Sequence, residues 1–241
     1  QGEQTLQATG LDNQGKIQTK GVQSIQADSL NNSGTLATDS ALTLAVNGDM
    51  SNSGTVAAGG DSRVTAKKAT NSGLIQAQGA QTLNASALSN SGKVQSGGAA
   101  QITAERLDNQ GLIGSQQSLA LHTADRLTLS DTGSIFAGDR LTMDGGQMTV
   151  DGVLTGKNGL MLNASSLFAG QNSLITSLGD IGFNAAQQSL YGELSTSGNI
   201  SLNGNDLLAG VGARIHSDAG LSILATNQAS VAGAMDAQSL D

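Results

Sequence analysis

The 241-residue sequence contains no cysteine, no proline and no tryptophan, and aromatic residues make up only 2% of it. The absence of cysteine excludes disulfides and thiolate metal sites. A compact globular domain normally fills its core with aromatic side chains, so this core must consist of Leu, Ile, Val and Ala. The formal net charge of −8 disfavours a general nucleic-acid binder. No apolar run reaches transmembrane length, so we expect no membrane insertion by this chain.

The sequence does contain a repeat. Asn-x-Gly recurs at intervals of 19 or 20 residues, and an aliphatic residue follows each glycine by two positions. After Ile113 the Asn-x-Gly phrase disappears, but the aliphatic residue continues at intervals of 19–22 as far as Met235. Stretches such as TLQA (5–8) alternate with period two, which is typical of β-strands, and no helical period is visible. The repeated asparagines are Asn13, Asn32, Asn52, Asn71, Asn90 and Asn109.

A repeat of about twenty residues cannot bury its own apolar face, so successive copies must stack, with parallel strands about 4.8 Å apart. We predict an all-β fold, a right-handed parallel β-helix of about twelve coils, each of roughly 19–22 residues. It forms a single β-helix over residues 1–241, regular over 1–115 and divergent over 116–241. A leucine-rich-repeat solenoid would need more leucines in each repeat and a helical segment.

Within such a coil, Leu30 and Leu36 should point into a narrow core. The repeated asparagines should stack as a vertical ladder in which each side-chain amide hydrogen-bonds to the amide of the next coil. Gly34 should lie at a tight corner that requires a positive φ, which glycine adopts without steric cost.

The polar side chains do not converge in any pattern that predicts chemistry. His122 and His216 lie about four coils apart and cannot share a metal ion. Asp12 and Asp108 share a column, but four coils without a carboxylate at that position separate them, which is too far for paired acid–base catalysis. Glycine-rich settings identify three further acidic residues as turn residues. We therefore predict no catalytic residue, no metal site and no cofactor. The three turn residues are Asp139, Asp144 and Asp151.

All the aromatic residues lie within 136–191. The position after the repeat leucine is polar in the early coils, and we assign Phe168, Tyr191 and Leu208 to it in the later coils. Alternation along a strand turns this position outward, and an exposed apolar stripe often marks a partner surface. The alternative is that changed spacing near 167–175 and 190–194 folds these side chains inward, or that another segment covers them.

The phrase Leu-x-Asn-x-Gly-x-Ile-x-Ala, with an alternating Leu-x-Ala strand between copies, resembles the haemagglutinin repeats of filamentous haemagglutinins. The same repeats occur in contact-dependent growth inhibition effectors, the CdiA family. The resemblance is close over residues 1–115 and looser beyond. It implies a secreted or cell-surface exoprotein of a Gram-negative bacterium, exported as a β-helical filament through an outer-membrane two-partner-secretion transporter. It also implies a role as shaft, adhesin or toxin-delivery stalk, with a target-cell receptor or glycan as partner.

Two classes of function follow. The favoured one is a non-enzymatic shaft segment of a surface filament, with a receptor-contacting surface in its second half. The alternative is a secreted β-helical enzyme that degrades polysaccharide, which would need aromatic platforms and convergent Asp, Lys or Arg. Neither end of the sequence shows the capping element with which solenoids usually shield their strand edges. We therefore expect the native polypeptide to continue in both directions.

Overall fold

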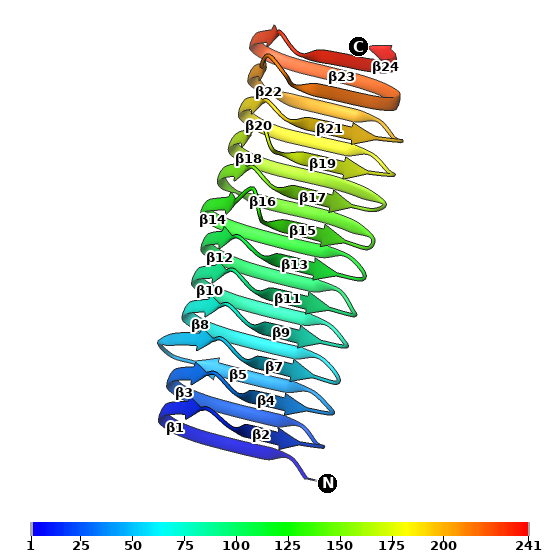
Figure 1. The fold of residues 1–241 in the computed structure, drawn as a ribbon. Helices are drawn as coiled ribbons and strands as arrows, with labels where there is room; N and C mark the ends of the chain where they lie inside the picture. Colours follow the sequence, from blue (N-terminus) through cyan, green and yellow to red (C-terminus); the bar gives the residue numbers. More distant parts are fainter. Residues whose placement is uncertain (1, 241) are drawn as a thin grey trace.

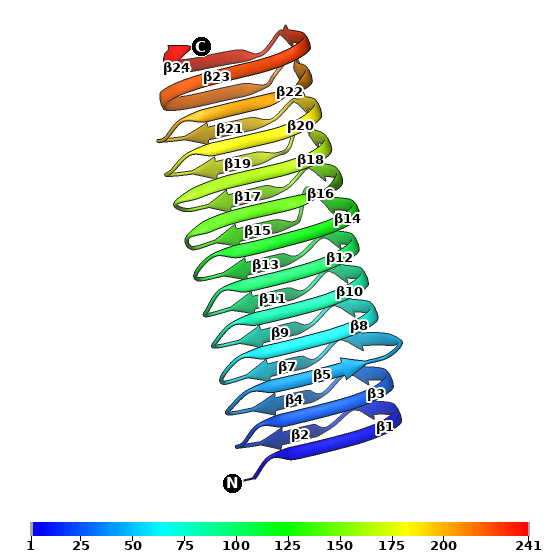
Figure 2. The same cartoon turned by 180° about the vertical axis from the view of Figure 1, so that it is seen from behind.

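The computed structural model describes residues 2–240 as a column of 24 β-strands, and none of these residues is helical. Figure 1 shows the chain winding upward from the N-terminus at one end to the C-terminus at the other, and Figure 2 shows the same column from behind. The strands pair in parallel over about twelve turns, which confirms the predicted parallel β-helix. At the usual strand spacing the column is about 55–60 Å long. No helix in this part of the chain could span a membrane.

Each turn of the column consists of one long strand and one short strand. The third turn differs, because its long strand is divided into β5 (Leu42–Val46) and β6 (Asp49–Asn52). The other long strands are β1 (Gln4–Asn13), β3 (Gln23–Asn32), β8 (Ser62–Asn71), β10 (Gln81–Asn90), β12 (Ala100–Asn109), β14 (Leu119–Leu129), β16 (Arg140–Val150), β18 (Gly159–Ala169), β20 (Ile181–Leu190) and β22 (Ile200–Ala209).

The short strands stack in a column of their own. Near the C-terminal end, β23 (Arg214–Val231) combines a short segment and a long one, and β24 (Ala234–Leu240) pairs with it. The remaining short strands are β2 (Lys16–Thr19), β4 (Thr35–Thr38), β7 (Thr55–Ala58), β9 (Leu74–Ala77), β11 (Lys93–Ser96), β13 (Leu112–Ser115), β15 (Ser134–Ala137), β17 (Val153–Gly156), β19 (Leu174–Ser177) and β21 (Glu193–Thr196).

Each long strand bends near its middle, so that a turn has three faces. In β3 the alternation of buried and exposed residues breaks at Asp28 and Ser29, which are both exposed. The ladder between β1 and β3 also skips the position before Ser29. In the third turn Asn47 and Gly48 separate β5 from β6 at this bend. This one-residue insertion explains why the repeat interval is 20 there instead of 19.

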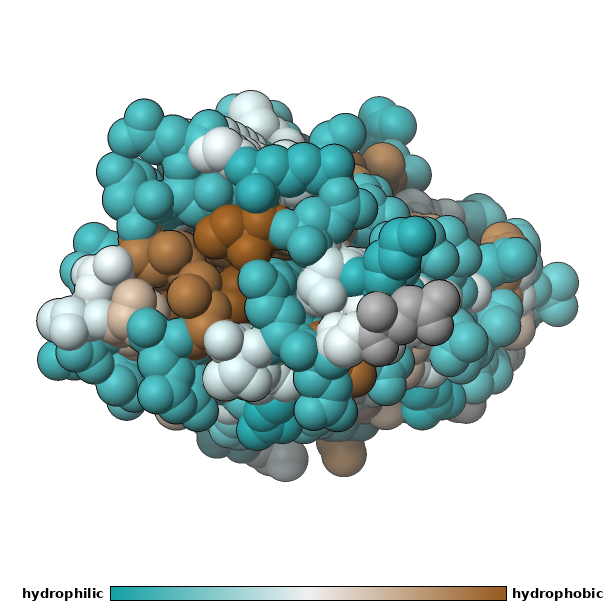
Figure 3. Space-filling view, turned by 90° about the horizontal axis from the view of Figure 1, so that it is seen from below, coloured by the Kyte–Doolittle hydropathy of each residue, from teal (hydrophilic) through white to brown (hydrophobic). Residues whose placement is uncertain are grey.

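The core is a narrow apolar column. The repeated aliphatic residues of the short strands stack in register, as the pairs Ile17↔Leu36 and Leu194↔Ile215 show. Leu30 and Leu36 are buried, as predicted. Figure 3, seen from the N-terminal end, shows apolar side chains gathered within a largely hydrophilic outline. The sequence therefore needs few bulky residues, because a cross-section this small is filled by a few aliphatic side chains from each turn.

The corner glycines serve a different purpose from the one predicted. Among the described residues only Gly159 and Gly212 have positive φ, so the prediction for Gly34 was wrong. A Cβ built on Gly34 would lie 2.1 Å from the backbone oxygen of Gly15 in the preceding turn. Glycine is required because consecutive turns approach closely at this corner. The same contact, at 2.1–2.2 Å, recurs at Gly54, Gly73, Gly92 and Gly111.

Candidate contact surface and its supporting ladder

The six repeated asparagines lie in one buried column at the ends of the long strands. The Nδ2 of each of the first five donates to the Oδ1 of the next asparagine at 2.6–2.8 Å. Each of the first five also donates to a backbone carbonyl of the next turn, for example from Asn71 to Lys93 at 3.1 Å. The column therefore satisfies its buried amides by stacking alone, which avoids the penalty for an unpaired buried polar group.

The ladder ends where the second region begins. Asn109 aligns with Leu129, and its Nδ2 donates to the backbone oxygen of Ser134 at 3.2 Å. Beyond this point the same inward position is apolar, because Leu129, Val150, Ala169, Leu190 and Ala209 occupy it. A second apolar column thus replaces the amide column inside the long-strand face.

Corner lengths change at the same boundary. In the first region two residues join every long strand to the following short strand. In the second region, corners of four residues (130–133, 170–173 and 210–213) alternate with corners of two residues (151–152, 191–192 and 232–233). Together with single-residue irregularities in β14 and β23, this alternation accounts for the uneven aliphatic intervals.

Of the three residues predicted to form one outward column, the structure aligns Phe168 and Leu208 but not Tyr191. Phe168 faces outward and is 44% exposed. Its column continues through Ser189 to Leu208, so Tyr191 does not belong to it, and that assignment was wrong. The assignment fails because Leu190 is not the repeat leucine of its turn. In the structure Gln188 occupies the leucine position of that turn, and Leu190 occupies the former asparagine position.

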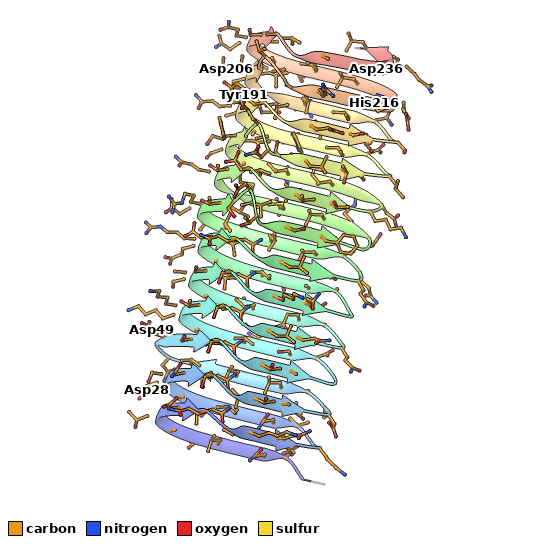
Figure 4. All side chains as sticks on the ribbon, in the orientation of Figure 1. Asp28, Asp49, Tyr191, Asp206, His216 and Asp236 are labelled. Atoms are coloured by element: carbon orange, nitrogen blue, oxygen red, sulfur yellow. The ribbon has the colours of Figure 1, made fainter. Side chains whose placement is uncertain are left out.

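Tyr191 nevertheless lies beside Phe168. The two ring centroids are 5.6 Å apart, with the ring planes inclined at 44°. On its other side the tyrosine ring covers Gly210, where an added Cβ would lie 2.3 Å from a ring carbon. Val211, in the same four-residue corner, is 80% exposed, and Leu208 is half-buried. We call Phe168, Tyr191, Leu208 and Val211 the corner cluster. Figure 4 labels Tyr191 on the edge of the column that carries these corners.

Gln188 is a buried residue that sequence reasoning missed. Its Nε2 donates to the backbone oxygen of Asn203 at 2.7 Å, at the bend of the following turn. Its Oε1 is buried and has no hydrogen-bond partner in the described structure. A polar residue in an otherwise apolar column is the only signal of this role that the sequence offers.

Charged side chains lie on the surface and pair across single turns. His216 lies between two carboxylates, with Nε2 3.0 Å from Asp218 Oδ1 and Nδ1 3.2 Å from Asp236 Oδ2 (Figure 4). The sequence does contain a signal for the second contact, because the 20-residue spacing from His216 to Asp236 matches one turn. His122 is exposed on β14, far along the column from His216. Within residues 2–240 no group of three or more His, Cys, Asp or Glu could hold a metal ion.

Carboxylates in the second region accept hydrogen bonds from neighbouring turns. Asp139 accepts from Ser118 Oγ at 2.8 Å and from Asn158 Nδ2 at 3.1 Å, and these bonds lower the pKa of its carboxyl. Asp139 and Asp151 lie at corners, as predicted, but Asp144 lies within β16, so its assignment to a turn was wrong. The glycines that follow Asp144 continue the strand, and Asp144 accepts from Asn163 Nδ2 of the next turn at 2.6 Å.

Two ion pairs join β12 to β14 across the boundary between the regions, and in the second of them Arg126 Nη2 lies 3.6 Å from Asp108 Oδ1. The Arg106 Nε lies 2.8 Å from Asp125 Oδ2, and this hydrogen bond raises the pKa of the Arg106 guanidinium. Both side chains are more than half exposed, so solvent screens the pair and its contribution to stability is small.

The fold and its dispersed polar surface define a β-helical repeat protein. The profile of the haemagglutinin repeat matches residues 1–23, 18–78, 76–131, 130–185 and 191–239. The chain therefore belongs to the haemagglutinin repeat family, as the sequence resemblance suggested.

The matches to individual relatives each cover about one third of the chain. A protein named tRNA nuclease CdiA from Escherichia coli strain STEC_O31 is 34% identical over 80 residues, which cover 33% of this chain and 2% of the relative. A protein named toxin CdiA from Escherichia coli is 32% identical over 80 residues, which cover 33% of this chain and 3% of the relative. The chain thus corresponds to a small part of much longer proteins. No solved structure matches significantly.

Proposed function

We propose that the chain is a non-enzymatic shaft segment of a bacterial cell-surface filament, either an adhesin or a contact-dependent toxin-delivery effector. The observation that carries this proposal is the continuous parallel stacking of about twelve turns built from one family of repeats. Each turn extends the column by one strand spacing, and the turns of the first region repeat the same polar exterior, which suits a spacer. The similarity to CdiA proteins supports export through an outer-membrane two-partner-secretion transporter and display at the surface of a Gram-negative cell.

The shaft proposal can be tested by shortening the column within the full-length parent protein. Removing residues 55–92 joins Gly54 to Lys93, deletes two turns of 19 residues and preserves the corner and the ladder. We expect normal surface display, a column shorter by about 10 Å, and retained target-cell contact. Removing residues 55–83 deletes one and a half turns and serves as the control, which should disrupt stacking. Loss of target-cell contact by the in-register variant, with display intact, would contradict a spacer role.

The enzymatic alternative is tested on the purified chain. Incubation with neutral and acidic bacterial polysaccharides should release no reducing ends and no unsaturated products. Release of either product, in proportion to the amount of protein, would overturn the non-enzymatic proposal.

We further propose that the corner cluster contacts the receptor on the target cell. Its support is the combination of an exposed phenylalanine on β18, an adjacent tyrosine in corner 191–192 and a valine in corner 210–213 that is 80% exposed. Apolar side chains grouped in this way on a polar surface often mark a partner site.

The test replaces Phe168, Tyr191 and Leu208 together by serine in the full-length protein. We expect unchanged display and circular dichroism, with reduced binding to target cells. Leu178→Ser is the matched control, because Leu178 is 62% exposed but lies outside the cluster. Unchanged binding by the triple variant would refute the contact surface, and loss of the fold would show that the cluster is structural.

A further inference from the structure

A separate hollow lies on the short-strand face, remote from the corner cluster. It has a volume of about 560 Å³ and spans β9, β11, β13 and β15. Gly114 leaves space in its turn, Gly97 lines the hollow one turn earlier, and Phe136 borders the hollow next to Gly114 in the following turn. The Phe136 side chain is 39% exposed, and its two neighbours in the same column, Gly114 and Thr155, are small. This volume lies within the range of sites that hold small ligands.

The lining offers amides and no charge. Gln76 and Gln95 stack in the column that continues to Gly114 and Phe136, and both are half-buried. Gln78 and Gln116 are exposed and border the hollow at the following corner. Each amide provides two donors and one acceptor oxygen. No Asp, Glu, Lys or Arg lines the hollow. The nearby Lys93 belongs to the adjoining column of β11 and is not part of the lining.

We propose that this hollow is a binding site for a neutral saccharide. The C–H groups on one face of a sugar ring are slightly positive and fit the negative face of the Phe136 ring. The hydroxyl groups at the ring edge can both donate to and accept from the glutamine amides. A charged sugar would lose hydration without finding a counter-charge in the lining. This site goes beyond the proposed shaft role and requires neither the corner cluster nor the parent protein.

Gly114 provides a direct way to fill the hollow. A Cβ at this position meets no atom closer than 3.9 Å, so a larger side chain fits without moving the backbone. Gly114→Leu should therefore occupy the space while the turn remains intact. Thr176→Leu is the matched control, because Thr176 lies further along the same outward column and does not line the hollow.

The experiment uses saturation-transfer difference NMR on the 241-residue chain. The probes are methyl glucoside, methyl galactoside, N-acetylglucosamine and their β-linked disaccharides, with galacturonic acid as the charged comparison. We expect millimolar binding of at least one neutral probe, with transfer to its ring protons. Phe136→Ala should weaken binding about three- to tenfold, and Gly114→Leu should abolish it. Thr176→Leu and Phe168→Ala should leave it unchanged.

Three results would overturn the saccharide site. They are no binding of any neutral probe at tens of millimolar, preferential binding of galacturonic acid, and binding that both Phe136→Ala and Gly114→Leu leave unchanged. Because the assay uses the isolated chain, each result leaves the shaft proposal standing. Circular dichroism of each variant shows whether an altered affinity reflects the hollow or a loss of fold.

Discussion

The first six turns and the last six turns fill the same inward position, at the end of each long strand, with different side chains. In the first region a column of asparagines closes the corner of each turn, and a glycine follows two residues later. In the second region aliphatic residues such as Leu129 and Val150 take the asparagine position, and corners alternate between four and two residues. An amide ladder requires the same residue in every turn, whereas apolar packing tolerates variation. The second region is therefore free to vary its surface.

The largest effect should come from the corner glycines of the first region. Gly73→Ala would place a Cβ 2.1 Å from the backbone oxygen of Gly54, so neighbouring turns must move apart. We expect a loss of about 3 kcal/mol in the free energy of unfolding, measured by chemical denaturation. Gly15→Ala is the control, because nothing lies within 4 Å of a Cβ at Gly15. Equal losses at both positions would contradict the close-approach explanation.

A polar residue placed in the apolar column should be the next most damaging change. Ala169→Asn introduces a buried amide between Val150 and Leu190, neither of which can hydrogen-bond to it through its side chain. We expect a loss of about 2 kcal/mol, from the unpaired amide and the added volume. Ala120→Asn, at an exposed position of β14, should be close to neutral. A neutral Ala169→Asn would show that the two regions are interchangeable.

Interrupting the amide ladder should cost somewhat less. Asn71→Ala removes the acceptor of Asn52 and the donor to Asn90, both at 2.8 Å, and leaves buried amide atoms unpaired. We expect a loss of about 1–2 kcal/mol in the free energy of unfolding. The comparison is Asn84→Ala, since Asn84 faces outward on β10. No difference between the two variants would argue that the ladder does not stabilise the column.

The smallest effect concerns pH. Hydrogen bonds from Ser118 and Asn158 lower the pKa of Asp139 in the folded chain, so the ionised form stabilises the fold. This contribution is present above the unfolded pKa of about 3.9 and is lost as the pH falls through the lower folded value. Asp139→Asn should therefore reduce the acid dependence of unfolding below about pH 4. An unchanged pH profile, compared with the parent chain under the same salt conditions, would count against this role.

The repeat spacing alone was sufficient to predict the fold class. The aliphatic residues recur at nearly constant intervals, and only stacked turns can bury them all. The inward column from Ile17 to Met235 could therefore be predicted from the sequence. The position of each repeated asparagine followed in the same way, because every corner between Asn13 and Asn109 has the same length.

Other features depend on contacts between turns, which the order of residues does not reveal. Whether Ser189 or Tyr191 shares the outward column of Phe168 depends on corner lengths and on which of two apolar positions each leucine fills. The need for glycine at position 34 comes from a carbonyl of the preceding turn, and the following turn supplies Asp236, one of the two carboxylates beside His216. Stacking brings together residues about twenty positions apart, and a shift of one or two residues at a corner changes which of them meet.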